Sequence, residues 1–584
     1  MDQTLRNQTA GYGSDVIAET LRDLGLRYIA LNPGASYRGL HDSLVNFTCG
    51  DPEILLCIHE EAAVAIAHGW AKVTGRPMAV ALHSNVGLMH GSMAIFNAFC
   101  DRVPMVIVGA TGPMDAAKRR PWIEWIHTAQ DQGALVRDFV KWDDQPGSVA
   151  AARDALIQGT AIAETAPRGP VYINVDAALH EQKLTAALAD PEIGRRGAPK
   201  AAAPAPDLVD QAASILDGAG SVVVMAGRLS RDRGDWDRRI ALVERLRARV
   251  IADFKTGATF PTMHPATVGR AGYFPDADAK AALAEADVIL NLDWVDFGGT
   301  LRSVFGDGPV PAKIISASLD THAHRGWSKD GGAPYPADVA FLNEPDQVVA
   351  ALVTALGTPD GSRDVPAAAL PAPAAGDRLT PQDVAVVLRR ALAGRRTCLI
   401  RGPLSWTGAD WPVDHPLGAL GYDGGGGIGS GCGMAVGAAL ALRDAGSDLL
   451  PLAVLGDGDF LMNASALWTG MKAGVPLLVV VLNNRSFYND EVHQETVAVE
   501  RGRPPENRHI GIAMTGPEID ISGIARGFGA WSPGLLTGAE AIAEAVGQAL
   551  DVVAGGGTAV LEIDTEKGYS PAMVKALRPG AAQS

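Results

Sequence analysis

The chain has 584 residues, of which 47% are hydrophobic and 67 are glycine, a composition typical of a large α/β protein with well-packed cores. Its 50 basic and 66 acidic residues give a formal net charge of −16, which argues against nucleic acid or an anionic membrane as a partner. At roughly 150 residues per domain, this length predicts about three to four domains.

The cysteines and the N-terminus both bear on the compartment of the protein. The five cysteines are scattered and form no Cys-x-x-Cys pair, which predicts free thiols in a reducing compartment. The sequence starts without a basic stretch followed by an apolar one, so we predict no secretory signal. No uncharged apolar run approaches the roughly 18 residues that span a bilayer. We therefore expect a soluble, cytoplasmic protein.

Two segments rich in proline and alanine interrupt a regular alternation of apolar strands and helices. They predict linkers at 189–206 and 357–378. The linkers separate an N-terminal domain (1–188), a central domain (207–356) and a C-terminal domain (379–584). We predict that all three are doubly wound α/β domains with parallel sheets.

In the N-terminal domain, short apolar strands end at polar or glycine-containing turns. The predicted strands are 27–31, 54–58, 77–82, 104–108 and 170–175. The second strand runs into Glu60 at the start of an alanine-rich helix, and the third runs into His83. Open α/β sheets bind ligands at the carboxyl ends of their strands, so both residues are candidates for a site.

The central domain repeats this rhythm with predicted strands at 221–225, 288–293 and 314–320. The first of them is not followed by Gly-x-Gly-x-x-Gly. That absence counts against a nucleotide-binding dehydrogenase.

The C-terminal domain carries the most informative stretch. An apolar strand at 452–455 precedes Gly456-Asp457-Gly458, a helix is predicted at 464–473, and a second strand at 476–482 precedes Asn483-Asn484.

Asp457 and Asn484 therefore lie at the carboxyl ends of two parallel strands. Their oxygens, with the carbonyl of Ser486 as a third ligand, suit Mg²⁺. The two glycines allow a diphosphate to approach the backbone. Without further context, a Gly-Asp-Gly turn is a weak signal, and the simpler interpretation is a strand end at which an aspartate caps the next helix.

This paired arrangement resembles the diphosphate-binding motif of thiamine diphosphate enzymes, and the resemblance extends over essentially the whole chain. It implies a member of the acetolactate synthase and benzoylformate decarboxylase superfamily, with a pyrimidine-binding (PYR), a central and a diphosphate-binding (PP) domain. The implied cofactors are thiamine diphosphate and Mg²⁺, with Asp457, Asn484 and Ser486 on the metal. The further residues implied to bind the cofactor are Gly456, Gly458, Asp459, Phe460 and Phe487.

Two positions depart from the usual pattern of this motif. Asp459 stands where a serine often contacts the diphosphate, and a carboxylate there is unfavourable beside phosphate. Arg485 stands where glycine is frequent.

The resemblance also assigns residues that act on the organic part of the cofactor. The helix that starts at Glu60 resembles the one whose glutamate hydrogen-bonds N1′ of the pyrimidine, with Glu61 as the alternative. A carboxylate there favours the imino tautomer, whose nitrogen takes the C2 proton of the thiazolium. Out of context, Glu60 is simply an acid in a first helical turn, favoured by the helix dipole. Ile428, the one bulky residue in the glycine run 424–431, is implied to wedge between the two rings, although an anchored flexible loop is the alternative.

His83 carries the prediction of reaction type. The benzoylformate decarboxylase branch places a histidine after this strand as proton donor and acceptor, and a near-neutral imidazole suits that role. In that branch a serine after Asn-Pro-Gly touches the substrate carboxylate. Here Ser36 stands one residue later than that position, and Arg38 or His41 are the alternative contacts for the carboxylate. The other predicted substrate contacts are Ala35, His90, Gln130 and Tyr488. The segment 119–125 either lines the site or forms an amphipathic helix with its two tryptophans in the core.

We therefore predict an enzyme that cleaves the C–C bond next to the carbonyl of a 2-oxo acid or related ketone, as a non-oxidative decarboxylase or lyase. One alternative is an acetolactate synthase-like carboligase, a transferase that joins the carbanion to a second carbonyl compound. A second is a non-catalytic thiamine diphosphate-binding protein, against which the presence of Glu60, Asp457 and Asn484 counts. His264-Pro265 resembles a central-domain signature of acetohydroxyacid synthases, so FAD is possible but not favoured. In the family the glutamate and the diphosphate site come from different subunits, so we expect a homodimer or homotetramer with active sites at the interface.

Overall fold

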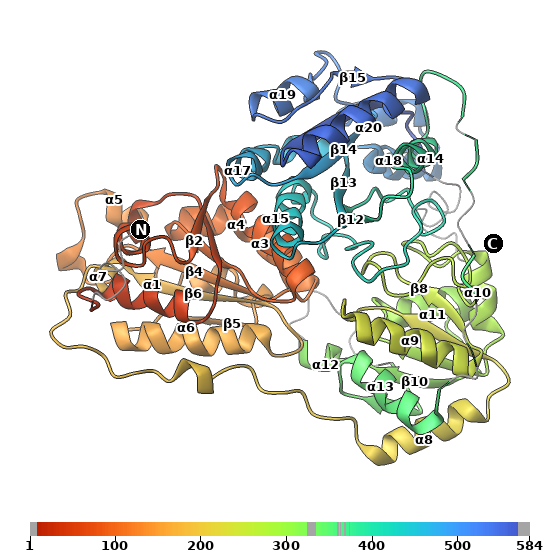
Figure 1. Cartoon of the computed structure of the whole chain (residues 1–584), viewed down its shortest axis with the longest axis horizontal. Coiled ribbons are helices and arrows are strands. Elements are labelled where there is room, and N and C mark those ends of the chain that lie inside the picture. Colours follow the sequence, from red (N-terminus) through yellow and green to blue (C-terminus); the bar gives the residue numbers. More distant parts are fainter. Residues whose placement is uncertain are drawn as a thin grey trace.

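The computed structural model describes residues 9–323, 335–358, 361, 364–366, 370–372 and 374–569. It contains three α/β domains, each with one parallel sheet between helices, and they form the three lobes of Figure 1. The predicted fold class is confirmed. The two chain ends that the predicted first and third domains include, and parts of the linker predicted at 357–378, lie outside the described residues.

The first sheet has six parallel strands in the order β2-β1-β3-β4-β6-β5. The strands are β1 (Tyr28–Leu31), β2 (Glu53–Leu56), β3 (Ala79–Leu82), β4 (Met105–Thr111), β5 (Trp142–Asp144) and β6 (Pro170–Asp176). The helices are α1 (Gly13–Asp23), α2 (Arg38–Asp42), α3 (Glu60–Thr74), α4 (Ser84–Cys100), α5 (Ile123–Ile126), α6 (Val149–Glu164) and α7 (Ala177–His180). The short edge strand β5 was not predicted, because its three residues are polar or half-buried and show no apolar run.

The central sheet has five parallel strands in the order β11-β10-β9-β7-β8. The strands are β7 (Val222–Ala226), β8 (Arg249–Ala252), β9 (Val288–Leu292), β10 (Lys313–Ala317) and β11 (Val339–Phe341). The helices are α8 (Pro206–Asp217), α9 (Arg233–Leu246), α10 (Ala277–Ala284), α11 (Phe297–Phe305), α12 (Asp320–Ala323) and α13 (Pro345–Leu356). A mostly irregular segment crosses from the first lobe to α8 along the lower edge of Figure 1.

The third sheet also has five parallel strands, in the order β12-β13-β14-β16-β15. The strands are β12 (Thr397–Arg401), β13 (Leu450–Gly456), β14 (Leu477–Asn483), β15 (Leu535–Leu536) and β16 (Thr558–Asp564). The helices are α14 (Pro381–Ala391), α15 (Gly431–Asp444), α16 (Asp457–Met462), α17 (Ala466–Lys472), α18 (Tyr488–Glu500), α19 (Ile521–Gly527) and α20 (Ala539–Ala554). Every residue of β14 is buried, as expected for a central strand covered by helices on both faces.

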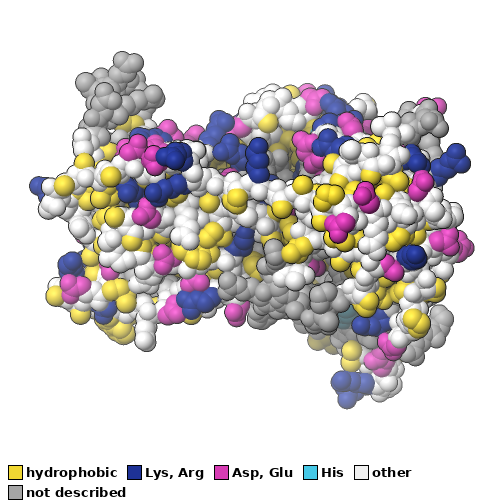
Figure 2. Space-filling model, turned by 90° about the horizontal axis from the view of Figure 1, so that it is seen from below, with side chains coloured by type: hydrophobic (Ala, Val, Ile, Leu, Met, Phe, Trp, Pro, Cys, Tyr) yellow, Lys and Arg dark blue, Asp and Glu magenta, His cyan; other side chains and the backbone are white. Residues whose placement is uncertain are grey.

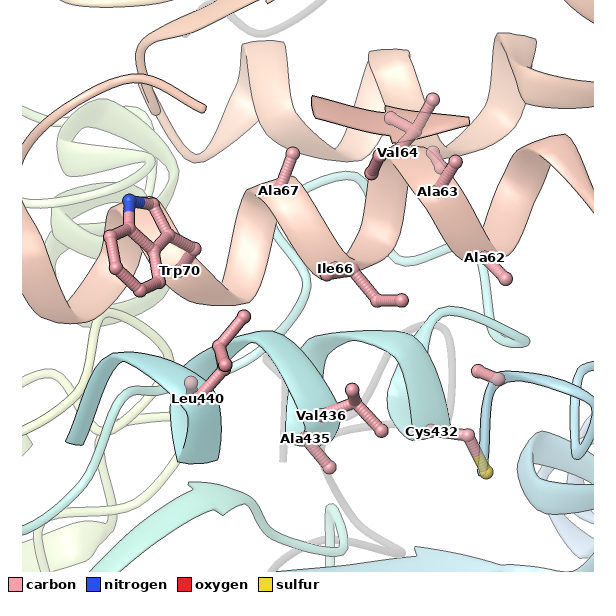
Figure 3. Close-up of a cluster of buried hydrophobic side chains, with 14 of the residues drawn as sticks. Ala62, Ala63, Val64, Ile66, Ala67, Trp70, Cys432, Ala435, Val436 and Leu440 are labelled. Atoms are coloured by element: carbon pink, nitrogen blue, oxygen red, sulfur yellow. The ribbon is translucent and has the colours of Figure 1, made fainter. Parts of the chain in front are cut away.

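The first and third domains meet through two helices, α3 and α15. Figure 3 shows α3 lying over α15, with Ile66 and Trp70 facing Val436 and Leu440. Glycines allow this close approach: a Cβ atom at Gly437 would lie 1.9 Å from the carbonyl oxygen of Ile66. The third domain is therefore fixed against the helix that begins at Glu60.

The surface charges, the helices and the cysteines each bear on an expectation drawn from the sequence. Basic and acidic side chains alternate over the face seen in Figure 2, without a broad field of one sign. Among the helices of the described ranges, none combines the length and the hydropathy needed to cross a membrane. All five cysteines are free, as predicted.

Candidate active site

The Asp457 cluster lies where β13 and β14 end side by side in the third domain. Asp457 is the first residue of α16, so the Gly-Asp-Gly stretch joins a strand directly to a helix. Its Oδ1 accepts the N–H of Gly458 at 2.8 Å, and its Oδ2 accepts the N–H of Ser486 at 3.2 Å. Burial raises the pKa of Asp457 to about 6, although these backbone hydrogen bonds favour the ionised form.

Three observations show that this cluster fits a divalent cation with a diphosphate. The Oδ1 of Asn484 is buried and has no hydrogen-bond partner among the described residues. Asp457 is a buried carboxylate that accepts hydrogen bonds from backbone N–H groups and forms no ion pair with a basic side chain among the described residues. A Cβ atom at Gly456 would point into open space, which leaves the backbone accessible. Hard oxygen ligands next to exposed backbone are what Mg²⁺ and phosphate oxygens require.

The aromatic neighbours of this cluster serve different purposes. The ring of Phe487 lies so close to Gly458 that a Cβ atom there would be 2.4 Å from it. Phe460 is fully buried in the core, so its backbone is the part that can face a ligand. Tyr488, at the start of α18, is half-buried with its ring 5.3 Å from that of Tyr569.

The two departures in the motif have structural explanations. The carboxylate of Asp459 accepts hydrogen bonds from the N–H groups of Gly429 and Gly431, so it is engaged by the glycine-rich loop. Arg485 has a φ of 58°, in the left-handed region that glycine adopts without strain. Its guanidinium is bound by Glu518 and Asp564.

The Glu60 cluster lies in the first domain, at the N-terminus of α3. Glu60 is buried, and its Oε2 is 3.0 Å from Nδ1 of His90 on α4. Gly87 makes room for it, because a Cβ atom there would be 3.2 Å from the Glu60 carboxylate. His59 caps α3 and stacks on His90 with ring centroids 5.0 Å apart. His59, Glu60 and His90 also offer nitrogen and oxygen ligand atoms within 4.8 Å of one another.

The neighbouring Glu61 points elsewhere. A Cβ atom at Gly429 would lie 3.3 Å from its Oε1, so Glu61 faces the glycine-rich loop of its own chain. Burial, with the negative charge of Asp459, raises the pKa of Glu61. The two neighbouring glutamates therefore contact different parts of the molecule: Glu60 contacts His90, and Glu61 contacts the glycine-rich loop.

His83 and Ser36 come together next to this cluster. Nδ1 of His83 is 2.8 Å from Oγ of Ser36, and Gly34 is required because a Cβ atom there would lie 2.4 Å from the imidazole. Burial and the nearby ring of His127 lower the pKa of His83, partly opposed by Glu60. The one-residue displacement of Ser36 thus leaves it in contact with the predicted histidine.

Sequence reasoning missed His127 in this cluster, whereas Glu124 belongs to the segment 119–125 that was predicted as a candidate lining segment. The ring of His127 packs edge-on against His83, with centroids 4.7 Å apart. Glu124 is buried, pairs with Arg120 and contributes to the electrostatics of His83. A signal for His127 was present, because it lies three residues after Glu124, just beyond the charged segment 119–125. Their distance in sequence from His83 concealed the contact.

The other predicted substrate residues are exposed or half-buried. Ala35 and Gln130 are exposed, His41 is half-buried on α2, and Arg38 pairs with Glu181. The core interpretation of the two tryptophans was wrong, because Trp122 and Trp125 are 69% and 68% exposed. A helix of four residues is too short to bury one face in the core.

The remaining predicted features lie on the glycine-rich loop and in the central domain. Ile428 is half-buried in the loop that precedes α15. His264 is a core histidine whose Nε2 is 3.3 Å from Glu244. A cavity of about 760 Å³ lies at the carboxyl edge of the central sheet, lined by both acidic and basic side chains, including Arg228, Arg231 and Asp293.

Family models match all three domains. The N-terminal TPP binding domain of thiamine pyrophosphate enzymes matches residues 12–136, the central domain 209–352 and the C-terminal TPP binding domain 404–563. The chain belongs to the thiamine pyrophosphate enzyme family. This membership confirms the resemblance drawn from the sequence.

Relatives narrow the class of chemistry. A benzoylformate decarboxylase of Pseudomonas aeruginosa is 27% identical over 88% of this chain and 91% of its own. An acetolactate synthase large subunit of Lactococcus lactis is 26% identical over 53% of this chain and 51% of its own. The protein is thus an enzyme of the 2-oxo acid decarboxylase or carboligase kind.

Solved structures agree on the fold. A thiamine diphosphate-dependent 4-hydroxybenzoylformate decarboxylase of Rhodococcus jostii superposes with a TM-score of 0.77 at 24% identity, over 96% of this chain and all of that one. A benzoylformate decarboxylase of Polynucleobacter necessarius gives a TM-score of 0.78 at 20% identity, with the same coverage. The fold class needs no correction.

Proposed function

We propose that the protein is a thiamine diphosphate- and Mg²⁺-dependent enzyme that cleaves the C–C bond next to the carbonyl of a 2-oxo acid without oxidation, as benzoylformate decarboxylase does. The observation that carries the reaction type is the pair of His83 and Ser36, 2.8 Å apart, next to the Glu60 cluster. A relative named benzoylformate decarboxylase, which is 27% identical over 88% of this chain, supports it.

The cofactor half of the proposed site is the Asp457 cluster. Asp457, the unpartnered Oδ1 of Asn484 and the carbonyl of Ser486 would hold Mg²⁺, and Gly456 would leave room for the diphosphate. When bound, thiamine diphosphate supplies the electron sink that lets the bond next to the substrate carbonyl break. Ile428 would contact its ring system from the glycine-rich loop.

The first-domain half moves protons and orients the substrate. Glu60 is buried, and its Oε2 shares a hydrogen bond with Nδ1 of His90. The carboxyl group is therefore placed to hold a proton at the pyrimidine N1′. His83 has a lowered pKa and is largely neutral near pH 7, so its unprotonated nitrogen can take up a proton and return it to the product carbon. Ser36 holds the imidazole in one orientation through Nδ1. His90 and the half-buried Tyr488 are the further candidates for substrate contact.

Two copies are proposed to complete each site. The residues around Glu60 belong to the first domain, and α4 carries Val86, Met89 and Met93 with exposed apolar side chains along one face. Apolar side chains exposed along one helix face favour burial against a partner. We propose that a second copy covers this face, so that its Asp457 cluster meets Glu60 in a dimer or a higher oligomer with active sites at the interface.

Carboligation is the second candidate. Several relatives are acetolactate synthases, and both reactions share the cleavage step. The difference lies in whether a proton or a second carbonyl compound takes up the resulting carbon.

An assay of the holoprotein with benzoylformate and, separately, pyruvate tests the proposal. CO₂ release and an aldehyde from benzoylformate or a branched 2-oxo acid are expected, with the rate dependent on Mg²⁺ and thiamine diphosphate. Acetolactate from pyruvate without aldehyde release would overturn the decarboxylase reading in favour of carboligation.

A further inference from the structure

The glycine-rich loop 424–431 lies between two buried carboxylates that share one arginine. Asp423 immediately precedes the loop and is 1% exposed, while Asp459 on α16 is 7% exposed. Nη2 of Arg401, at the end of β12, is 3.2 Å from Oδ2 of Asp423 and 3.6 Å from Oδ2 of Asp459. Arg401 itself is 3% exposed. The charges of these three side chains are thus enclosed beside the loop.

Each carboxylate divides its two oxygens between Arg401 and the loop. Oδ1 of Asp423 accepts the N–H of Gly426 at 3.0 Å. Oδ1 of Asp459 accepts the N–H of Gly429 at 2.8 Å and that of Gly431 at 3.3 Å. One guanidinium therefore orients the groups that fix both ends of the loop.

Other contacts complete this support. Nδ2 of Asn97, on α4, donates to the carbonyl of Gly427 at 2.9 Å and to Oγ of Ser430 at 3.1 Å. The Arg401 guanidinium lies 3.4 Å from the centroid of the Tyr422 ring. We call Arg401, Asp423 and Asp459, with their bonds to the loop, the clamp. The backbone is held at Gly427 and Gly429, on either side of Ile428, so these contacts set the position of the Ile428 side chain.

The energetics of the cluster point to positioning rather than stability. Burial raises the pKa of Asp423 to about 6 in spite of Arg401. Nε of Arg401 has no acceptor among the described residues. Desolvation of buried charges commonly offsets their attraction, and removing one partner leaves an uncompensated charge. A loop of glycines has many accessible backbone conformations, so fixed hydrogen-bond anchors restrict its conformation more than that of other segments.

We infer that Arg401 is a positioning residue, which acts through Asp423 and Asp459 to hold the loop 424–431, and with it Ile428, in its binding geometry before the cofactor arrives. The geometry of the clamp stands by itself; the consequence for thiamine diphosphate rests on the proposed function. Asp459 is accordingly assigned to the loop and not to the diphosphate.

The test compares Arg401→Met, Arg401→Lys and Asp459→Asn with the wild type. Asp459→Asn retains an oxygen for the two N–H groups but loses the charge that faces Arg401. Arg396→Met is the matched control, because Arg396 precedes the same strand and pairs with Asp448 at the surface. Hydrogen exchange of peptides spanning 424–431 is measured on the metal-free protein, followed by thiamine diphosphate affinity at saturating Mg²⁺ and thermal unfolding.

For Arg401→Met we expect at least tenfold faster exchange in 424–431 and at least tenfold weaker thiamine diphosphate binding, with partial rescue in Arg401→Lys. Asp459→Asn gives a smaller change confined to the end of the loop that contains Gly429. In an Asp423→Asn, Asp459→Asn background, Arg401→Met has little further effect. Arg396→Met matches the wild type.

Unchanged exchange and affinity in folded Arg401→Met would overturn the inference. If that variant does not fold, Asp459→Asn decides it by the same readouts. Wild-type protein that does not bind thiamine diphosphate would contradict the proposed function, while the exchange measurement would still test the clamp.

Discussion

The Asp457 cluster in the third domain is held mainly by backbone groups, whereas the Glu60 cluster in the first domain is held by side chains from several separate segments. Asp457 accepts N–H groups of Gly458 and Ser486, all within one strand–helix unit and its neighbour. His83 depends on Ser36 and His127, which come from two other parts of the chain. A backbone-built site has a short sequence signature, and a site built from side chains does not. The first can therefore be recognised from the sequence as a unit, whereas in the second the sequence singles out Glu60, His83 and Ser36 but not the contacts that join them.

The largest expected effect comes from Glu60→Gln, which alters the side-chain-built half alone. The amide keeps the size of the side chain but cannot exchange a proton with N1′. We expect kcat to fall by about 10²–10⁴-fold, the range typical of general acid–base catalysis, with thiamine diphosphate affinity little changed. Single-turnover kinetics and calorimetric binding check this. Full activity in the variant would remove Glu60 from its proposed role.

Asp457→Ala tests the other half. Loss of a charged metal ligand should weaken Mg²⁺-dependent binding of thiamine diphosphate by about 100-fold or more, and EDTA should have the same effect on the wild type. Isothermal titration with and without Mg²⁺ measures it. Asp448→Ala, an exposed acid in the same domain, is the control. Retained affinity would rule out a metal role for Asp457.

The packing of the first domain against the third within one chain is tested by Gly437→Ala. The new methyl would lie 1.9 Å from the carbonyl of Ile66, so α3 and α15 must separate. We expect a loss of about 1–3 kcal/mol or more in the free energy of unfolding, as for other overpacked cores. Gly547→Ala is the matched control, because it lies in α20 with nothing within 4 Å of the added atom. There the substitution should stabilise by about 0.5–1 kcal/mol, and equal effects of the two would contradict the packing argument.

One buried group in each of the two domains should contribute to the response to acid in opposite directions. Burial lowers the pKa of His180 in the first domain to about 4, so the unfolded chain binds more protons and stability falls as the pH drops below about 6.5. Burial raises the pKa of Asp423 in the third domain to about 6, so there the folded state binds more protons and stability rises as the pH drops through 6.

Domain-resolved hydrogen exchange between pH 7 and 5 measures these slopes. His180→Leu should reduce the acid loss in the first domain by about 2 kcal/mol at pH 5, from roughly 1.4 kcal/mol per pH unit. Asp423→Asn should remove part of the gain in the third domain. Parallel slopes in both domains, unaffected by these substitutions, would refute the assignment.

Much of the fold followed from apolar runs in the sequence. Predicted strands such as β14 are continuous apolar runs, whereas the edge strands β5 and β11, of three residues each, were not predicted. Strand β16 was also missed although six of its seven residues are buried, because Glu562 and Asp564 interrupt its apolar run. Helix α16 was not predicted as a helix, because glycines flank Asp457 and are unfavourable in helix interiors.

The candidate site divides in the same way. Asp457, Asn484 and Glu60 were singled out from local patterns. The contact between His83 and His127 joins residues far apart in the sequence. The Arg401 clamp likewise depends on the end of β12 lying beside α16 in the folded chain, and no local sequence pattern encodes that contact.

The most direct test of the account is complementation between Glu60→Gln and Asp457→Ala, each inactive by itself. If each active site joins the first domain of one copy to the third domain of another, a mixed dimer contains one site free of both substitutions. Random re-association should then restore about a quarter of wild-type activity, because half of the dimers are mixed and each has one intact site. Mixed dimers that form, as verified by differential tagging, but remain inactive would contradict the proposed union of the two clusters across copies.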